Sequence, residues 1–367
     1  MDLENRLKLI KLPPTEEIVT ENELIELLKT NKKIVAYDGF EPSGLMHLGS
    51  GLLRVIKLND FLNAEIDFII YIADWFAYIN NKFGGNLELI KKAGEYFIEG
   101  WKSLGLDISK VKIVWCSDLI KDSEYWETFL KISKLVTIKR TLRAVTIAGR
   151  EESEVKNPSL LIYPLMQATD VLMLNDKKGV DICQLGMDQR KVNMLVREII
   201  ENFGRKKPIA IHHHLLMGLQ ASARMGAYDE NEEINKQISF KMSKSKPDTC
   251  IFIHDDEEEI KRKILNSFCP PKETENNPIA EIVKYIIFRK FDSFTIKRKE
   301  KYGGKLEFIS YEEFESSYKK GEIHPLDLKN SVAEYLNFIL EPSREYFEKN
   351  EKARELYEIV KKANITR

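Results

Sequence analysis

The sequence predicts an α/β fold, in which a doubly wound parallel sheet with a helical insertion precedes a mostly α-helical C-terminal domain. Three observations support this prediction. Short apolar runs, each of a length that suits one buried strand, recur up to residue 213. Amphipathic helical patterns separate these runs, and alternating strands and helices favour a parallel sheet. From about residue 251 the sequence becomes charged, helical in pattern and punctuated by prolines.

The individual elements follow from local patterns. A helix is expected at residues 21–29, and the apolar runs predict strands at residues 34–37, 66–73, 111–116, 180–183 and 208–213. Residues 87–104 place apolar side chains at helical spacing before Gly105, which suits a helix C-terminus. Residues 119–157 show no strong strand pattern, so we interpret them as the helical insertion. A chain of 367 residues predicts one large and one smaller domain.

The first predicted strand leads through a turn-rich segment into a helical pattern. The turn at residues 38–44 is followed by His47-Leu48-Gly49-Ser50, and helical periodicity runs from Leu48 to Leu62. A helix N-terminus at the end of a strand presents unpaired backbone amides and partial positive charge. The sequence therefore predicts a phosphate-binding site at this turn.

A second motif supplies cations two-thirds of the way along the chain. Its sequence is Lys241-Met242-Ser243-Lys244-Ser245, followed by Lys246 and Pro247. The ammonium groups can reach a triphosphate and neutralise the charge that develops during phosphoryl or nucleotidyl transfer. Taken alone, the pentapeptide fits a solvated basic loop equally well.

As a pair, in this order and context, the two motifs resemble the HIGH and KMSKS signatures of class I aminoacyl-tRNA synthetases. We call residues 47–50 the HIGH segment and residues 241–245 the KMSKS loop. The chain departs from the family at Ser50, where a second histidine is usual, and serine cannot carry a charge. The resemblance implies a Rossmann-like catalytic domain over residues 1–250. It also implies ATP with Mg²⁺ as substrate and no tightly bound cofactor or metal.

A third segment, Tyr163-Pro164-Leu165-Met166-Gln167-Ala168-Thr169-Asp170, places proline where a helix can begin. Gln167 and Asp170 then share a face with Tyr163 at the helix entrance, and from spacing alone this is the wet side of an amphipathic helix. The segment resembles the substrate helix of tyrosyl-tRNA synthetases of the archaeal and eukaryotic type. Further matches, at Tyr37 with Gly39 and at residues 186–191, extend the resemblance from about residue 20 to beyond residue 340.

The resemblance assigns a role to each matching residue. Tyr37 and Asp170 would hold the phenol of tyrosine, beside Gly39, and the amino-acid ends would bind Tyr163, Gln167 and Gln189. His47, Lys241 and Lys244 would be catalytic. The expected ATP-binding residues are Gly39, His47, Gly49, Ser50, Asp188, Lys241, Ser243 and Lys244, with Asp188 on the ribose. Phe76 stands where the family often has histidine.

The basic run at residues 297–305 surrounds an aromatic side chain, Tyr302, which suits contact with RNA phosphates and bases, although a solvated loop has the same pattern. Its resemblance to the anticodon-binding region of archaeal-type enzymes makes residues 251–367 an anticodon-binding domain. Tyr302 would stack on an anticodon base, and Asp327 would read a guanine edge. Arg143 and Arg190 would meet the first acceptor pair of tRNA(Tyr), and the family implies a homodimer.

Composition limits the alternatives. The 57 basic and 58 acidic residues nearly cancel, so net charge argues neither for nor against RNA. No apolar run is long enough to span a bilayer and residues 1–11 are unlike a signal peptide, so we expect a cytoplasmic protein with no membrane partner. Two other functions remain open: a tryptophanyl-tRNA synthetase, and a synthetase paralogue or RNA-binding scaffold that does not charge tRNA. The triplet His212-His213-His214 is interpreted as strand histidines rather than a zinc site.

Overall fold

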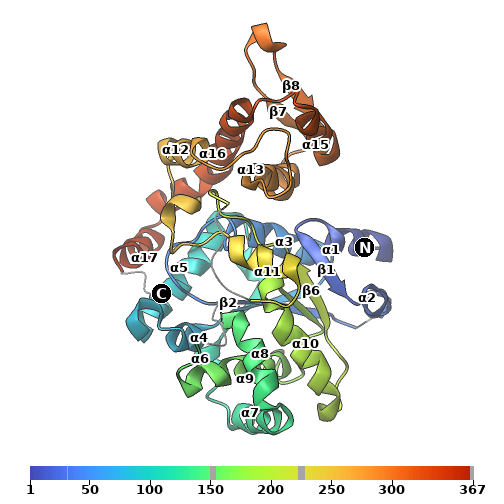
Figure 1. The fold of residues 1–367 in the computed structure, drawn as a ribbon. Helices are drawn as coiled ribbons and strands as arrows, with labels where there is room; N and C mark the ends of the chain where they lie inside the picture. The colour runs from blue at the N-terminus through green and yellow to red at the C-terminus, as the bar shows by residue number, and fades with distance from the viewer. Residues whose placement is uncertain (31, 149–153, 222–227, 364–367) are drawn as a thin grey trace.

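The computed structural model describes residues 1–367 except residues 31, 149–153, 222–227 and 364–367 and the side chains of Ala148 and Tyr302. In this part of the chain the main sheet has six strands in the order β1-β6-β5-β2-β3-β4 (Figure 1). Strands β2 to β6 run parallel, and β1 pairs antiparallel with β6. The strands are β1 (Thr15–Val19), β2 (Val35–Phe40), β3 (Asp67–Ile72), β4 (Val111–Trp115), β5 (Ile182–Gly186) and β6 (Ile209–His213).

The five parallel strands confirm the predicted sheet. Strand β2 continues to Phe40, into the segment predicted as a turn, and β5 begins two residues after the predicted start and ends three residues after the predicted end. Strand β1 was not predicted, because its sequence Thr-Glu-Glu-Ile-Val carries two adjacent acidic residues and is only half-buried. As an edge strand, β1 offers these carboxylates to histidines of its neighbour. Glu17 accepts from His212, and Glu16 lies 2.5 Å from His214. The edge is therefore fixed by side-chain pairing that an apolar pattern cannot reveal.

Helices cover both faces of the main sheet, as the doubly wound prediction requires. Alternation along β2 separates the two cores, since Ala36 packs with α3 and α5 whereas Tyr37 packs with α9 and α10. The helices that precede the C-terminal region are α1 (Leu3–Lys11), α2 (Glu21–Leu28), α3 (Leu52–Asn63), α4 (Asp74–Ile79), α5 (Leu87–Ser103), α6 (Cys116–Leu119), α7 (Ser123–Leu135), α8 (Ile138–Ala144), α9 (Pro158–Met173), α10 (Arg190–Ile199) and α11 (Glu232–Phe240).

The expected helical insertion contains α7 and α8, at the bottom of Figure 1. Helix α5 also matches its predicted pattern, because Ile90, Phe97 and Trp101 are buried along one face. Gly105 follows with φ +93°, a left-handed conformation that favours glycine and ends the helix.

The C-terminal region is mostly helical, as predicted, but it also contains a small hairpin. Its helices are α12 (Glu257–Leu265), α13 (Pro278–Ile282), α14 (Phe288–Lys290), α15 (Tyr311–Lys320), α16 (Pro325–Lys349) and α17 (Glu351–Lys362). Strands β7 (Phe294–Ile296) and β8 (Leu306–Phe308) pair antiparallel, and the basic run joins them at the top of Figure 1. Three residues per strand are too few to show an alternating pattern, so the hairpin was missed.

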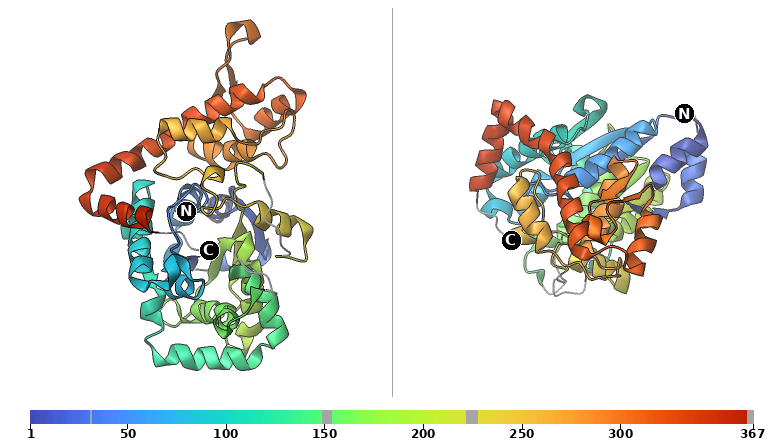
Figure 2. Two further views of the ribbon diagram at one scale, coloured as in Figure 1. Left: turned by 60° about the vertical axis from the view of Figure 1, so that its left-hand side comes forward. Right: turned by 90° about the horizontal axis from the view of Figure 1, so that it is seen from above.

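The C-terminal region returns to the sheet through α17, which lies beside α5 (Figure 2). His254 stacks on Tyr357 of α17 with ring centroids 3.9 Å apart, and the Tyr96 hydroxyl of α5 lies 2.8 Å from His254 Nε2. The same Tyr96 oxygen accepts a hydrogen bond from the amide of Met46 at 3.1 Å. The C-terminal helix thus packs next to the residue that precedes the HIGH segment.

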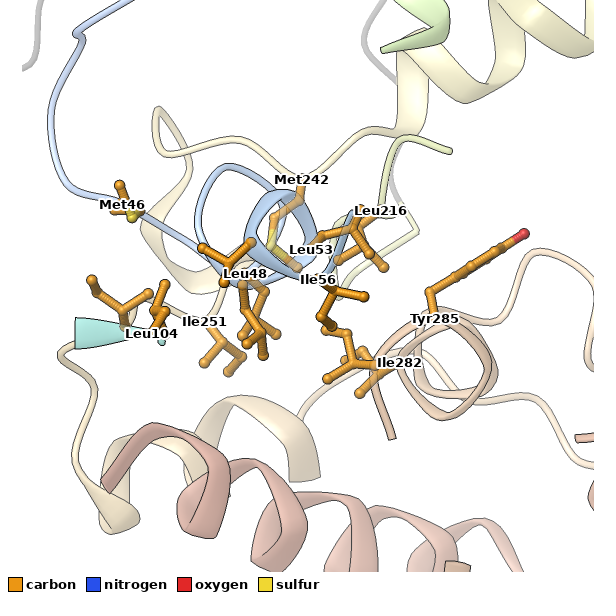
Figure 3. Close-up of a cluster of buried hydrophobic side chains, with 14 of the residues drawn as sticks. Met46, Leu48, Leu53, Ile56, Leu104, Leu216, Met242, Ile251, Ile282 and Tyr285 are labelled. Carbon is orange, nitrogen blue, oxygen red and sulfur yellow. The ribbon is translucent and has the colours of Figure 1, made fainter. Parts of the chain in front are cut away.

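Residues 251–253 also join the C-terminal region to the HIGH segment. The amide of Leu48 donates to Ile251, and that of Ile253 donates to Met46. Figure 3 shows a cluster that combines side chains of both nucleotide motifs with side chains of the C-terminal region. Its labelled members are Met46, Leu48, Leu53, Ile56, Leu104, Leu216, Met242, Ile251, Ile282 and Tyr285. No helix in the described part of the chain is long and apolar enough to cross a membrane.

Candidate active site

A cavity of about 730 Å³ opens at the carboxyl ends of β2, β5 and β6. The chain leaves β2 toward β3 and β4 on one side and returns to β5 and β6 on the other. This topological switch point is where doubly wound sheets bind ligands. The cavity is lined by every predicted tyrosine- and ATP-binding residue: Tyr37, Gly39, His47, Gly49, Ser50, Tyr163, Gln167, Asp170, Asp188, Gln189, Lys241, Ser243 and Lys244.

The HIGH segment is a hydrogen-bonded turn, and α3 begins after it at Leu52 rather than at the predicted Leu48. The amides of Ser50 and Gly51 donate to the carbonyl of His47, and Ser50 Oγ accepts from the His47 amide at 3.2 Å. The turn replaces the first helical turn because these contacts satisfy its backbone groups. Ser50 therefore supports the turn through its side-chain oxygen.

The same turn orients the imidazole of His47. The amide of Gly49 donates to His47 Nδ1 at 3.1 Å, so the neutral ring carries its proton on Nε2 and can donate from there. A Cβ atom on Gly49 would lie 3.1 Å from His47 Cε1, which is tighter than ordinary packing. Glycine at this position therefore lets the ring lie against the turn.

Lys241 and Asp188 form a close ion pair inside the cavity, with Nζ 2.6 Å from Oδ2. Burial raises the pKa of Asp188, but the charges of Lys241 and Arg54 outweigh it and hold that pKa below its ordinary value. A Cβ atom on Gly186 would lie 2.6 Å from Asp188 Oδ1. Gly186, which was not predicted, is thus required for the position of this carboxylate, and its place at the end of β5 is the signal that could have found it.

The KMSKS loop is attached to the segment that follows β6. Met242 donates its amide to Leu216 at 2.6 Å, and the backbone of Lys241 pairs with Met217. Farther along the loop, the Lys244 ammonium lies 5.2 Å from the ring centroid of Phe97 on α5. Burial, with the charge of Lys82, lowers the pKa of Lys244 to about 7. A polyanion beside Lys244 would stabilise its charged form.

Helix α9 differs from the prediction at its start. It begins at Pro158 and contains Pro164 in its interior, so the expected start at Pro164 is wrong. Pro158 occupies the first turn, where helices favour proline. Pro164 removes one internal hydrogen bond without ending the helix. The predicted shared face remains, because Tyr163, Gln167 and Asp170 all line the cavity.

The floor of the cavity contains a buried carboxyl group surrounded by phenols. Asp170 is fully buried, and its Oδ1 accepts a hydrogen bond from the Tyr125 hydroxyl at 2.9 Å. Among the described residues, Asp170 Oδ2 and the hydroxyl of Tyr37 have no hydrogen-bond partner. Burial raises the pKa of Asp170 to about 8. Since buried polar groups are normally paired, this donor and acceptor suit a polar group of a ligand.

Farther up the wall, polar side chains suit the charged ends of an amino acid. Gln167 donates to Gln189 Oε1 at 3.2 Å, and the Tyr163 hydroxyl donates to Glu41 Oε2 at 3.1 Å. Glu41 was not predicted, although it directly follows β2 at the carboxyl edge of the sheet. Phe76 takes the place of a polar side chain and packs edge-to-face on Tyr163, with centroids 4.6 Å apart.

The three consecutive histidines contact different partners. His212 lies 2.9 Å from Asn193 Nδ2, His214 lies between Glu16 and Glu281, and His213 contacts Gln184 and Arg54. Among the described residues no group of three His, Cys, Asp or Glu side chains could hold a metal ion. The three histidines pair with side chains of neighbouring elements, as histidines of a buried strand do.

Comparison with known proteins identifies the family. The profile of the class I tRNA synthetases (W and Y) matches residues 29–239 and 236–341. The chain belongs to this synthetase family. A tyrosine–tRNA ligase of Thermococcus sibiricus is 43% identical over the whole length of both chains. A crystal structure of tyrosyl-tRNA synthetase from Pyrococcus horikoshii, complexed with L-tyrosine, has a TM-score of 0.88 and 41% identity, with 98% of this chain and 100% of that chain covered.

The tryptophanyl relatives are more distant. A crystal structure of tryptophanyl-tRNA synthetase from Aeropyrum pernix K1 has a TM-score of 0.66 and 18% identity, and the alignment covers 93% of this chain and 85% of that chain. At that identity the likeness concerns the fold alone.

Among the residues that the structure describes, those expected to contact tRNA do not line the cavity. Arg143 pairs with Glu230 at 3.1 Å, and Arg190 with Glu17 at 2.9 Å. Asp327 lies in the first turn of α16, and the backbone of Tyr302 lies between β7 and β8, with its side chain outside the described part. Within the neighbouring basic run, Lys297 pairs with Glu334 and Arg298 donates to the carbonyls of Gly304 and Glu322. Two cations of the basic run, Lys297 and Arg298, therefore stabilise the hairpin.

Proposed function

We propose that this chain is a tyrosine–tRNA ligase, which activates L-tyrosine with ATP and transfers the tyrosyl group to tRNA(Tyr). The observation that carries the proposal is the buried set of Tyr37 and Asp170, whose unpaired hydroxyl and carboxyl oxygen match the hydroxyl of a phenol. The relatives at 41–46% identity, all named tyrosine–tRNA ligase, support the same substrate.

In the first step, a carboxylate oxygen of tyrosine attacks the α-phosphorus of ATP. A P–O bond forms, the bond to the β-phosphate breaks, and pyrophosphate leaves with the electron pair. His47 donates from Nε2 to phosphate, and Lys241 and Lys244 stabilise the charge that gathers on the departing pyrophosphate. ATP enters as its Mg²⁺ complex, since Mg²⁺ prefers phosphate and water ligands. The enzyme itself supplies position and charge rather than a nucleophile.

The amino-acid pocket holds the substrate at both ends. The phenol hydroxyl donates to Asp170 and accepts from Tyr37, while Tyr163, Gln167 and Gln189 hold the ammonium and carboxylate groups. A site built to bond a hydroxyl rejects an analogue that lacks it by a factor on the order of 10⁴ to 10⁵. Selection of tyrosine over phenylalanine therefore needs no editing step.

In the second step, a terminal hydroxyl of tRNA attacks the carbonyl carbon of tyrosyl-adenylate, and AMP leaves. We assign activation to a catalytic domain at residues 1–250 and anticodon recognition to residues 251–367. Tyr302 stacks on an anticodon base, and Asp327 accepts the two adjacent N–H groups of a guanine. Arg143 and Arg190 meet the first acceptor pair. Because aminoacylated tRNA is consumed in translation, we propose that the enzyme works in the cytoplasm.

We also propose that the enzyme is a homodimer through α7 and the start of α8. Apolar side chains on these helices are exposed, with Trp126 at 42%, Leu130 at 65% and Ile138 at 74%. Apolar groups gathered on one exposed surface mark a contact with another chain. A second copy is the occupant that the family implies, and a symmetric contact would bury the same surface on both copies.

Tyrosine-dependent exchange of labelled pyrophosphate into ATP tests the proposal. We expect exchange with tyrosine, and none above background with tryptophan or phenylalanine at equal concentration. A preference for tryptophan would support the tryptophanyl alternative, because indole offers one N–H and no phenol. Absence of exchange with every amino acid would support a non-catalytic RNA-binding scaffold.

A further inference from the structure

Arg54 is a cation in the cavity that the mechanism above does not use. It is the third residue of α3, after the HIGH segment, and its side chain lines the cavity although only 14% of it is exposed. The guanidinium lies above the ring of Phe40, with Cζ 5.2 Å from the centroid. Burying a charged group costs free energy unless the group is paired, so Arg54 requires partners inside the protein.

Two buried partners hold Arg54 in place. Its Nη1 lies 3.0 Å from Oδ2 of Asp38, which is fully buried on β2, and also contacts the imidazole of His213 on β6. Burial and the charge of Arg54 hold the pKa of His213 well below its ordinary value, so the ring is neutral and can accept. The guanidinium is therefore fixed between two strands at the carboxyl edge of the sheet.

The other guanidinium nitrogens take no part in these two contacts. Within the described part of the chain, the ion pair and the hydrogen bonds of Arg54 all involve Nη1. Nε and Nη2 keep their donors for a ligand. A Cβ atom on Gly186 would lie 2.6 Å from Asp188 Oδ1 and 3.5 Å from Nε2 of His213, the ring that Nη1 of Arg54 contacts, so Arg54 and Asp188 lie on either side of the same imidazole edge. Arg54 thus presents donors beside the carboxylate that we assign to the ribose of ATP.

The chemistry of this pair fits a sugar diol better than a phosphate. Each ribose hydroxyl donates one hydrogen bond and accepts others, whereas a carboxylate only accepts and a guanidinium only donates. Arg54 and Asp188 together satisfy both capacities. The charge of Arg54 is already offset by Asp38 in direct contact, which makes it a weak centre for a triphosphate but a well-fixed donor for a neutral hydroxyl.

We propose that Arg54 is a ribose-binding residue, which donates from Nε or Nη2 to a ribose hydroxyl of ATP opposite the carboxylate of Asp188. This inference rests on the proposed function and adds a nucleotide contact to it. An interpretation in which Arg54 only fastens α3 to β2 and β6 makes a different prediction, because it gives the ribose hydroxyls no part.

The test compares ATP with 2′-deoxy-ATP and 3′-deoxy-ATP in tyrosine-dependent pyrophosphate exchange. In the wild type, we expect one deoxy analogue to have a raised KM. In Arg54→Met the KM for ATP should rise about ten- to a hundred-fold, as expected for a lost hydrogen bond to a charged group, and the ratio of KM values for that analogue and ATP should shrink. The KM for tyrosine should stay within about two-fold.

Three further variants separate a ribose contact from structural damage. Asp38→Asn combined with Arg54→Met removes the carboxylate that Arg54→Met would leave buried and unpaired, and it should show the same loss of discrimination. Arg54→Lys keeps the ion pair but not the fork, so it carries the test if Arg54→Met does not fold, and its ratio should also shrink. Arg205→Met is the matched control, because Arg205 donates to carbonyls at the end of α9, away from the cavity, and the ratio should stay at the wild-type value.

A ratio that stays at the wild-type value in the folded Arg54 variants would overturn the inference, and so would an equal rise in the KM values of ATP and tyrosine. Wild-type protein that fails to exchange with any of the three nucleotides would instead refute the proposed function.

Discussion

Replacing Asp170 by alanine should damage the choice between tyrosine and phenylalanine more than any other property of the enzyme. Asp170 is fully buried, its Oδ1 is occupied by Tyr125, and its Oδ2 is unpaired beside the unpaired hydroxyl of Tyr37. Tyrosine can pair both groups through one hydroxyl. Phenylalanine leaves both unpaired in the floor of the cavity.

The size of the effect follows from these two groups. An unpaired buried polar group costs about 1–3 kcal/mol, so the two groups together disfavour bound phenylalanine by about 2–6 kcal/mol. Alanine at position 170 removes one of the two, and the ratio of kcat/KM for tyrosine and phenylalanine should fall about ten- to a hundred-fold. Pyrophosphate exchange with each amino acid gives this ratio directly.

The matched control is Tyr125→Phe, which removes the hydrogen bond behind Asp170 but leaves the carboxyl group in the floor. Its tyrosine-to-phenylalanine ratio should stay within a few-fold of the wild type. An unchanged ratio in Asp170→Ala would refute the reasoning, because the carboxyl group would then have no part in recognising the phenol.

The remaining predictions concern other parts of the molecule. Lys244→Ala should slow exchange by about 10² or more without weakening tyrosine binding, and an equal loss of both would refute its role. Because the Lys244 pKa is lowered to about 7 in the protein without ATP, kcat/KM for ATP should fall from pH 6 to 8 as the ammonium loses its proton, and Lys244→Arg should lack this fall. Asp327→Ala should leave exchange intact but lower kcat/KM for tRNA charging about ten- to a hundred-fold, only for tRNA with the recognised guanine; equal loss in both assays would make Asp327 structural. Burial lowers the His254 pKa from 6.5 to about 3, so the folded state resists protonation and should lose roughly 2–3 kcal/mol of stability between pH 6.5 and 4.5. Urea unfolding of His254→Phe should show a smaller loss, whereas an identical one would exclude His254 as the cause. Leu130→Glu should give monomers in light scattering, and an unchanged mass would move the dimer contact elsewhere.

The sequence predicts the parts of the fold that depend on local apolar patterns. Strands β2 to β6 and helix α5 carry such patterns. Strand β1 depends instead on pairing of Glu16 and Glu17 with distant histidines, and the hairpin of β7 and β8 on contacts that three-residue strands do not encode. The interior position of Pro164 shows the same limit, since tertiary packing overrides the local tendency of proline to begin a helix.

For the cavity, the sequence identifies residues that form recognisable motifs, and the structure gathers them at one edge of the sheet. It misses Glu41, Gly186 and Arg54, which lie in or beside the same motifs but depend on geometry for their roles. Gly186 is needed because a side chain would meet Asp188, and Arg54 is oriented by Asp38 and His213 from two other strands. Such contacts between separate elements cannot be read from spacing along the chain.

The most direct test of the central claim is the charging of tRNA(Tyr) with labelled tyrosine by the full-length protein in the presence of Mg²⁺ and ATP. A tyrosine–tRNA ligase should attach tyrosine to tRNA(Tyr) only when ATP is present and should not attach tryptophan to it. Exchange of pyrophosphate without any charging of tRNA(Tyr), or attachment of tryptophan in preference to tyrosine, would contradict the assignment.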